Sequence, residues 1–361
     1  MEKSKNSISI EKLLPYLTPE FSLLFALFVS VVVVYYTIPN LSFAETTGIF
    51  FKSLYDANFN NLTAFSNFMI NSTPLILTGL AHSLAFRSGL FNIGVEGQYT
   101  VAAITAAALG LIKGLPFFIH VPVIIIGAIA AGAFWAFIPG FFKAVRGTNE
   151  VVNTIMMNYI AMHVFNYIVR VPLKQPNSVQ TERIQPSAQL LRFMGDRYRL
   201  NIGIFIAIAV AFAVWYFLNK TKSGYELRAT GFNMYGAEYG GINRKRNIIL
   251  GMVISGGLAG LAAVTQVLGP DLAVKELAGF SGYGFNGIAV ALLAKSNPLG
   301  VILSALLFGA LLNAGPYLQM QGISKDLVYI MQALVILFVA ADYIWKIIID
   351  RRKKKEVAKV G

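Results

Sequence analysis

Residues 86–100 read FRSGLFNIGVEGQYT, and they interrupt a long apolar region with charged, amide and glycine residues. On both sides the chain is apolar over lengths that suit a lipid bilayer. A charged, glycine-broken segment at membrane depth is costly unless protein shields it or it lines a water-filled cavity. The stretch therefore predicts a broken membrane helix, and the break is the first place to look for a solute path.

The composition sets the class of protein. Residues of the apolar set AVILMFWYC make up 56% of the 361 positions, and only 13% are charged. Soluble domains carry ~25% charged residues, so this composition indicates a protein that crosses the bilayer many times. The chain has no cysteine, which excludes disulfides, thiolate catalysis and cysteine-bound metals. The net charge of +13 lies mostly in short segments between apolar runs, as the positive-inside rule predicts, and this favours a membrane role over nucleic-acid binding.

We predict an all-α polytopic membrane protein with about ten transmembrane helices, since each span needs ~20 mostly apolar residues. The predicted spans are 21–38, 67–86, 93–112, 117–142, 150–170, 200–218, 248–268, 281–294, 298–317 and 327–347. An even number of spans puts the N- and C-termini in the cytoplasm, where the basic run Arg351–Lys355 belongs. Glycines break 93–112 and 281–294, so these two helices either cross fully or re-enter.

The segments between spans complete a single transmembrane domain over residues 1–361. We expect residues 1–20 and a basic tail at 348–361 in the cytoplasm, and extracytoplasmic loops at 39–66 and 171–199. The longest cytoplasmic segment is 219–247, and its centre, Tyr235–Tyr239, lies among glycines. That pattern predicts a short helix at the membrane surface, a shape suited to docking a partner. An ordinary connecting loop remains the alternative.

Acidic residues are the sharpest filter for a site. Of the 17, Glu96 and Glu150 stand out because they fall within or just enter the predicted membrane region in polar stretches of the sequence. Glu150, Asn153, Thr154 and Asn158 recur at helical spacing on one face, which must meet protein or water. Such a face either lines a pathway or bonds neighbouring helices, and both readings remain open. For Glu96 we favour a water-filled cavity.

A second glycine-rich stretch lies at 280–296. Gly282, Gly284 and Gly287 match G-x-G-x-x-G, but no βαβ unit surrounds them, so a dinucleotide site is not indicated. The pattern favours a helix start or break at membrane depth. FNIGVEG at 91–97 loosely resembles FNGIAVA at 285–291, which suggests two related halves with a site at their interface.

The motifs that are missing restrict how transport could be driven. The sequence contains no G-x-x-x-x-G-K-[ST] motif, so the chain is not its own P-loop ATPase. It has no series of intramembrane charges typical of a proton relay. The three histidines show no metal-ligand spacing, and we expect no metal. If the chain pumps a solute, the energy enters through a partner.

Four motifs in order resemble a known family. LFNIGVEGQ at 90–98, GTNEVVNTIMMNYIA at 147–161, LRATGFNMYGAEYGGI at 227–242 and GYGFNGIAVALLA at 282–294 resemble the permease subunits of bacterial ABC importers for nucleosides. These permeases sit in a wider group that serves simple sugars and branched-chain amino acids. The resemblance runs from about residue 67 to 345. Among the two unequal permeases of nucleoside systems, the chain resembles the larger.

The resemblance implies a non-enzymatic importer subunit, multi-pass in the bacterial cytoplasmic membrane, that works by alternating access. Its implied partners are a second permease in a heterodimer, a cytoplasmic ABC ATPase that carries ATP and Mg, and a lipid-anchored extracytoplasmic binding protein. No cofactor is expected in this chain. The implied ATPase-coupling residues of 219–247 are Gly231, Asn233, Gly236, Ala237, Glu238, Tyr239 and Gly241. The candidate pathway residues are Asn92, Glu96, Gln98, Glu150, Asn153, Asn158, Phe285 and Asn286.

The choice of solute is only partly constrained. A nucleoside is neutral, and amides and a carboxylate can bond its hydroxyls and base edges while aromatic side chains stack on its flat face. A ribose-like sugar would use the same polar groups without the rings. Two other classes are alternatives, an ion-coupled secondary transporter and a membrane-embedded enzyme acting on lipid or isoprenoid substrates. The coupling segment argues against the first, and the lack of clustered carboxylates or a His–Asp pair against the second.

Overall fold

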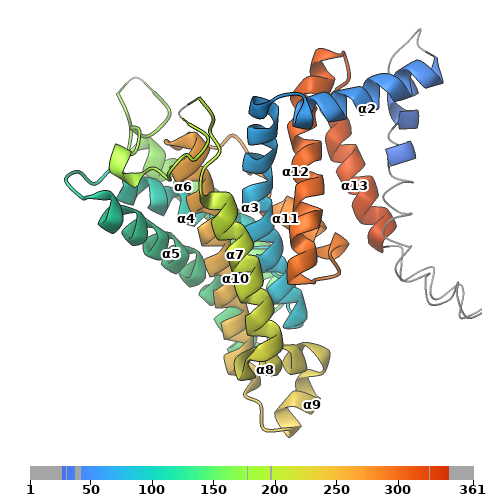
Figure 1. The fold of residues 1–361 in the computed structure, drawn as a ribbon. Coiled ribbons are helices and arrows are strands. Elements are labelled where there is room, and N and C mark those ends of the chain that lie inside the picture. The colour runs from blue at the N-terminus through green and yellow to red at the C-terminus, as the bar shows by residue number, and fades with distance from the viewer. Residues whose placement is uncertain are drawn as a thin grey trace, which may run out of the picture. The chain divides into compact units, whose positions relative to one another are not determined.

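The structure is a computed structural model, and it describes residues 27–29, 31–36, 42–176, 178–195, 197–324 and 326–340. In that part of the chain all regular structure is helical, and the β-type pairings are isolated bridges between loop residues. The helices are α2 (Phe43–Phe59), α3 (Leu62–Arg87), α4 (Val95–Gly110), α5 (Phe117–Arg146), α6 (Glu150–Arg170), α7 (Gly203–Lys220), α8 (Lys222–Phe232), α9 (Met234–Tyr239), α10 (Arg244–Gln266), α11 (Tyr283–Leu293), α12 (Pro298–Met320) and α13 (Asp326–Ala340) (Figure 1). The all-α prediction is confirmed for these residues.

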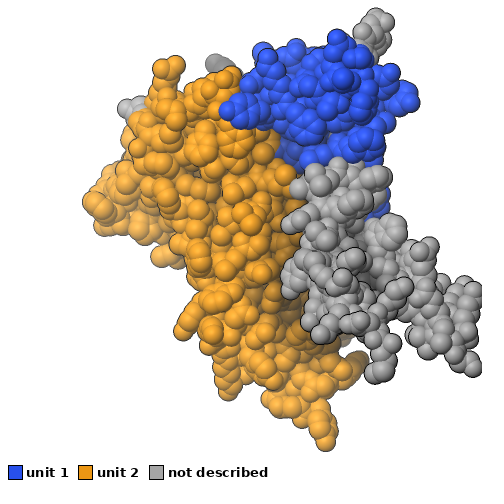
Figure 2. Space-filling model, turned by 45° about the vertical axis from the view of Figure 1, so that its right-hand side comes forward, with its two compact units in different colours: residues 1–57, 311–361 blue, residues 58–310 orange. Residues whose placement is uncertain are grey.

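The chain divides into two compact units, coloured separately in Figure 2. Unit 1 comprises residues 1–57 and 311–361, and unit 2 comprises residues 58–310. Unit 1 has its own apolar core, in which Phe50 and Val34 of the N-terminal part pack with Leu311 and Leu318 of the C-terminal part. All the candidate site residues lie in unit 2.

Helix α10 is the centre of unit 2. It packs against α3, α4 and α5, and most of its length is buried. Its closest neighbour is α5, because both helices carry small residues where they meet. A Cβ atom on Gly256 would collide with the carbonyl oxygen of Gly132, so glycine is required for this approach of the two backbones. Small residues at helix contacts are how membrane helices gain close packing without a hydrophobic driving force.

The loop between α6 and α7 closes one end of unit 2, and α8 and α9 form the other end (Figure 1). A short 3₁₀ turn, Pro186–Ala188, lies within the loop. The loop bonds the segment that follows α10 through the N–H groups of Thr181, Ile184 and Leu190, which donate to the carbonyls of Val274, Leu272 and Leu268 at 2.9 Å each. A π-helical turn, Val267–Asp271, ends α10 there. The loop thus fixes the chain between α10 and α11.

Four helical stretches in the described part of the chain are long and apolar enough to cross a membrane. They are α5, α7, α10 with its π-helical turn, and α12. Helix α11 has 11 residues, or about 16 Å at ~1.5 Å per residue, roughly half of a ~30 Å hydrocarbon core. The class of membrane protein is supported, and the count of ten crossings remains a prediction.

Two of the predicted segments differ in detail. Residues 39–66, expected as a polar loop, contain the whole of α2, which has 17 residues. Residues 1–20, the first part of the span predicted at 21–38, and the basic tail at 348–361 lie outside the described residues. The sequence missed α2 because its polar residues mask an apolar side, on which Phe50 is fully buried.

Candidate functional site

The carboxylate of Glu96 joins the two glycine-rich breaks. One oxygen, Oε1, accepts hydrogen bonds from Ser281 Oγ at 2.6 Å and from the backbone N–H of Gly282 at 2.9 Å. The other, Oε2, accepts from the backbone N–H of Gly284 at 2.7 Å. These donors lie at the start of α11, where the N–H groups have no partner within the helix and the helix dipole favours a negative charge. The helix start predicted from the glycines is confirmed at Tyr283.

Glycine is required at position 284 for this contact. A Cβ atom there would lie 2.8 Å from Glu96 Oε2 and 2.5 Å from Glu96 Cα, so any larger residue would separate the two segments. The side chain of Glu96 is fully buried. In this structure the Glu96 carboxylate meets the second break, and its exposure to a water-filled cavity in another state stays a prediction. The backbone of the second break takes the place that water was expected to fill.

The amide side chains of Asn92 and Gln98 hold the first break from within. Asn92 Nδ2 donates to Gln98 Oε1 at 3.0 Å, and Gln98 Nε2 donates back to Asn92 Oδ1 at 3.0 Å. Asn92 Nδ2 also donates to Ser255 Oγ on α10 at 2.9 Å, and Ser255 Oγ donates to the carbonyl of Ala81 on α3 at 2.9 Å. The network thereby ties α3, α4 and α10 together, and Asn92 and Gln98 are both buried.

The predicted polar face of α6 splits between two tasks. Asn158 is buried and bonds the first break, since its Oδ1 accepts from the N–H of Gly97 at 2.8 Å and its Nδ2 donates to the carbonyl of Ile93 at 3.1 Å. Nearer the start of α6, Glu150 pairs with Lys143 at 2.7 Å. Asn153 Nδ2 donates to Thr148 Oγ1 at 2.7 Å. Of the two readings left open above, these contacts fit bonding between helices, and a pathway role for the face remains a prediction.

A cavity of about 450 Å³ lies beside the second break, within the range of small-molecule sites. Its walls come from α4, the end of α10 and the chain between α10 and α11. The lining residues are Tyr99, Thr100, Ala103, Phe165, Arg199, Val267, Pro270, Asp271, Ala273, Val274, Lys275, Glu276, Leu277, Ser281 and Tyr283. Ser281 is shared with the Glu96 contact, so the wall of the cavity and the start of α11 are held by the same hydrogen bonds.

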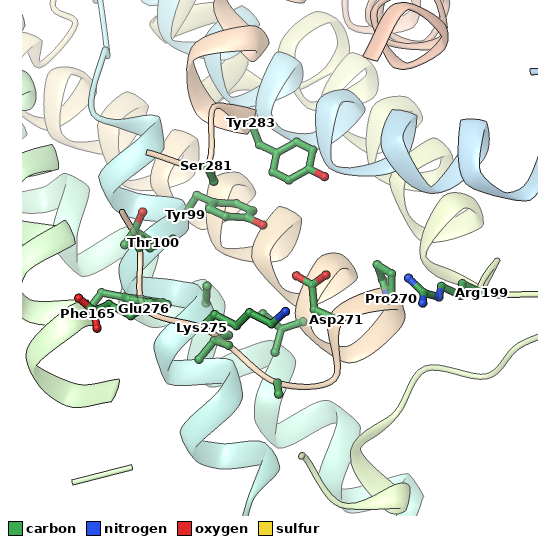
Figure 3. A pocket seen from close by; sticks show the side chains of 15 residues that line it. Tyr99, Thr100, Phe165, Arg199, Pro270, Asp271, Lys275, Glu276, Ser281 and Tyr283 are labelled. Atoms are coloured by element: carbon green, nitrogen blue, oxygen red, sulfur yellow. The ribbon is translucent and has the colours of Figure 1, made fainter. Parts of the chain in front are cut away.

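The cavity combines aromatic faces with charged and hydroxyl groups. The rings of Tyr99 and Tyr283 lie 5.7 Å apart between centroids, tilted by 46°. Figure 3 shows their hydroxyl groups on the side toward which Asp271 projects, with Lys275 extending toward the same carboxylate. Asp271 Oδ1 accepts from Gln266 Nε2 at 3.0 Å, which orients the carboxylate. The arrangement suits a neutral solute that has a flat ring and several hydroxyl groups.

No pathway residue predicted from the sequence lines this cavity within the described structure. Asn92, Glu96, Gln98 and Asn158 are buried behind its wall, and Glu150 and Asn153 lie at the start of α6. Phe285 and Asn286 lie on the first turn of α11, where Phe285 is 36% exposed and contacts the ring of Phe280 at 5.4 Å. The sequence missed Tyr99, Ser281 and Asp271. Asp271 stands three residues beyond the predicted span at 248–268, so the filter for intramembrane acids passed over it.

The segment between α7 and α10 forms two short helices. Helix α9 (Met234–Tyr239) falls on the predicted short helix, and Asn233 caps it by accepting from the N–H groups of Tyr235 at 3.1 Å and Gly236 at 2.9 Å. Glu238 lies 3.4 Å from Arg244. Tyr239 is 98% exposed and Ala237 only 6%. Gly231 lies in the last turn of α8, and Gly241 turns the chain with a φ of 82°. The segment thus presents aromatic side chains to its surroundings.

No group of three or more residues able to hold a metal ion occurs among the described residues. The buried imidazole of His82 contacts the carbonyl of Gly284 at 2.8 Å, so it belongs to the packing of the second break. His120 lies between Ser187 Oγ and the carbonyl of Leu109, at 2.9 Å from each. Both side chains serve as links between segments.

Comparison with known proteins identifies relatives over most of the chain. Residues 64–340 match the family described as branched-chain amino acid transport system / permease component. The guanosine ABC transporter permease protein NupP of Bacillus subtilis is 40% identical over 310 residues, which cover 84% of this chain and 89% of that protein. The nucleoside ABC transporter permease protein NupB of Lactococcus lactis is 35% identical over 291 residues, which cover 78% of this chain and 80% of that protein.

A sugar permease is also similar. The glucose ABC transporter permease protein TsgB13 of Haloferax volcanii is 30% identical over 357 residues, which cover 94% of this chain and 92% of that protein. The two bacteria named above each have a second permease that matches, NupQ at 28% and NupC at 30% identity. No solved structure matches the chain.

Proposed function

Because this chain belongs to the family of permease components of branched-chain amino acid transport systems, we propose that it is a membrane-spanning permease subunit of an ABC importer that carries nucleosides. Two of the relatives with guanosine or nucleoside in their names, NupP and NupB, are 40% and 35% identical to it, against 30% for the glucose permease. The chain itself is a transporter subunit and performs no catalysis. ATP and Mg belong on a separate ATPase.

The observation that carries the choice of solute is the cavity beside the second break. Tyr99 and Tyr283 offer aromatic faces for a base, and the Asp271 carboxylate can accept hydrogen bonds from ribose hydroxyls or base N–H groups. Its volume of about 450 Å³ suits a small molecule of this kind. A glucose-like sugar would use Asp271 and Ser281 without needing two rings, so it is the second candidate.

The buried pathway candidates take a supporting role in this proposal. Glu96 holds the start of α11 beside the cavity, and the first break is held in place by Asn92, Gln98 and Asn158. The path continues along the first turn of α11 past Phe285 and Asn286. Glu150 and Asn153 brace the start of α6. Alternating access would then move α11 as one body with α4. Three donors at the start of α11 bond to the one carboxylate of Glu96 on α4 and so join the two helices.

The remaining subunits follow from the exposed segment and from the relatives. Paired permeases among the relatives support a second permease subunit. We assign α8 and α9 to docking on the ATPase, with Tyr239 and Glu238 at the contact, and we place this end of unit 2 in the cytoplasm. A lipid-anchored binding protein would deliver the solute to the loop between α6 and α7. The protein would then reside in the bacterial cytoplasmic membrane, with both termini on the ATPase side.

The test is uptake of labelled nucleoside in cells with and without this chain, in a strain that lacks other nucleoside carriers. We expect uptake to fall to background on deletion, and unlabelled nucleosides to compete while ribose, glucose and leucine do not. Competition by sugars alone would reassign the solute and leave the permease assignment standing. Uptake unchanged by deletion would overturn the nucleoside assignment.

Substitutions of the residues that line the cavity test whether the solute binds there. Asp271→Asn removes a charged acceptor, and loss of such a hydrogen bond is worth ~1.5–3 kcal/mol, so the KM for uptake should rise about tenfold or more. Tyr283→Phe should keep most uptake, since the ring remains, and Tyr283→Ala should lose it. Glu182→Gln, an exposed carboxylate in the loop between α6 and α7, is the matched control. Equal effects of Asp271→Asn and Glu182→Gln would remove the cavity from the pathway.

A further inference from the structure

A second cavity, of about 320 Å³, lies at the opposite end of unit 2, where the end of α3 meets α8. Its lining residues are Phe86, Arg87, Arg228, Gly231, Phe232, Lys295 and Ser296. Three of these are cationic, and none of the described lining residues is acidic. We call it the basic cavity. It shares no residue with the proposed solute cavity, and Figure 1 shows α8 beside the last turn of α3 at this end.

Arg228 is the residue that points to a missing anion. Its Nε atom is buried and has no hydrogen-bond partner in the described part of the chain. Arg87 lies near enough for the two positive charges to repel each other. A buried donor without an acceptor is unfavourable, and a second cation beside it adds to the cost unless an anion lies between them. Arg87 has the carbonyl oxygen of Ser296 as an acceptor for its Nε, whereas the Nε of Arg228 has no acceptor among the described residues.

The turn after α11 completes the basic cavity. Lys295 and Ser296 have φ values of 49° and 56°, in the left-handed region that residues with a side chain rarely adopt. The turn presents the carbonyl of Ser296 to Arg87 Nε, which donates to it at 2.6 Å. Because Nε of Arg87 bonds the carbonyl of Ser296, the other nitrogen atoms of its guanidinium group can face the basic cavity. Backbone strain of this kind collects at binding sites, and here it places a third cation at the cavity.

We propose that the basic cavity binds the phosphate group of an anionic lipid headgroup. Guanidinium groups form paired hydrogen bonds with phosphate oxygens, and two of them with a lysine match the charge of a phosphodiester. The rim of the basic cavity suits the acyl chains of a lipid, because Phe86 and the 89% exposed Phe232 supply apolar surface beside the cations. Basic pockets between membrane helices at the cytoplasmic side hold anionic headgroups in this manner. Free phosphate shares the headgroup chemistry and lacks the acyl chains.

The experiment measures thermal unfolding of the full-length chain, purified with its accompanying subunits in a neutral detergent. Phosphatidylglycerol should raise the melting temperature, and phosphatidylcholine with the same acyl chains should not. Arg228→Gln should weaken the apparent affinity for phosphatidylglycerol roughly fivefold, the effect of one basic residue at an anionic surface. Arg228→Lys keeps the charge and should fall between. Arg146→Gln, at the exposed end of α5, should respond as the wild type does.

A second readout separates a binding defect from a folding defect. In detergent without anionic lipid, Arg228→Gln should melt no lower than the wild type, because it removes the repulsion with Arg87. The proposal is overturned if Arg228→Gln keeps the full response to phosphatidylglycerol, or if phosphatidylcholine acts equally. Inorganic phosphate that reproduces the whole response would assign the cavity to a free anion in place of a lipid.

Discussion

Two glycine-broken polar segments of this chain differ in burial, because one is enclosed by other helices and the other is exposed. In the breaks around Glu96 and α11, the polar side chains are buried and their hydrogen bonds end on other helices. In the segment of α8 and α9, Tyr235 is 76% exposed and Tyr239 98% exposed. Both segments combine glycine, asparagine, glutamate and aromatic residues. The difference lies in whether the donors and acceptors find partners inside the fold, and it separates a structural lock from the surface that we propose for docking the ATPase.

The largest expected difference between the two segments is in the stability effects of removing Glu96 and Glu238. Glu96→Ala leaves the buried N–H of Gly284 and the partly buried N–H of Gly282 without an acceptor, at ~1–3 kcal/mol each, so we expect the free energy of unfolding to fall by about 2 kcal/mol or more. Glu238→Ala removes a carboxylate that is 54% exposed, and an exposed ion pair contributes under about 1 kcal/mol. The measurement is thermal or denaturant unfolding in detergent. Similar losses in both variants would refute the distinction between lock and surface.

Glycine-to-alanine pairs sharpen the same point with a smaller change. Gly284→Ala pushes a methyl group against Glu96, and overpacking of this kind costs ~1–3 kcal/mol. Gly279→Ala, in the chain just before α11, is the matched control, because a Cβ atom there meets nothing within 4 Å. We expect a lower melting temperature and reduced uptake only for Gly284→Ala. A normal melting temperature for Gly284→Ala would show that the two breaks separate easily.

On the docking side, a bulky residue should affect transport and leave stability unchanged. Ala237 is only 6% exposed, so a bulky residue there would disturb the packing. Gly240 is the better position for a bulky residue, since a Cβ atom there makes only ordinary contacts. Gly240→Trp should reduce uptake about tenfold, roughly the 1.4 kcal/mol of a blocked contact, with an unchanged melting temperature. ATP hydrolysis measured alongside should become independent of solute. Normal uptake in this variant would place the ATPase contact elsewhere.

The smallest expected effect concerns an ion pair at the far end of unit 2. Arg170 donates to Glu276 and thereby lowers the pKa of Glu276 below its ordinary value of 4.5. A lowered pKa in the folded state stabilises above the unfolded pKa, and the contribution disappears as the pH falls through the folded pKa. The difference in melting temperature between wild type and Arg170→Gln should therefore be small at neutral pH, shrink as the pH falls below the unfolded pKa of ~4.3, and vanish once the pH is below the lowered folded pKa. A difference that grows on acidification would contradict this assignment.

The sequence predicted the elements whose signals are local. The glycines at 282–287 indicated the start of α11, and the glycines around Tyr235–Tyr239 indicated α9. Both predictions rest on backbone needs that neighbouring residues express. The predicted membrane class rests on composition, which does not depend on the fold.

The partners of Glu96 could not be predicted in the same way. They lie 185 to 188 residues further along the chain, and no spacing rule joins two segments so far apart. The cavity was missed for the same reason, because Tyr99, Asp271 and Tyr283 come from three separate segments. A useful signal was available in Gly269, Pro270 and Asp271, which end an apolar run with a turn and an acid. Read as a helix end near the membrane surface, they would have marked the cavity wall.

The brevity of α11 has a consequence for synthesis of the protein. With 11 residues it is too short to insert into a bilayer alone. It is followed after a four-residue turn by α12, so the two would enter the membrane together as a hairpin. Until then Glu96, made 185 residues earlier, has no helix start to neutralise it. The nascent chain therefore carries an unmatched carboxylate through most of its elongation, and arrival of α11 is the event that allows the first break to settle.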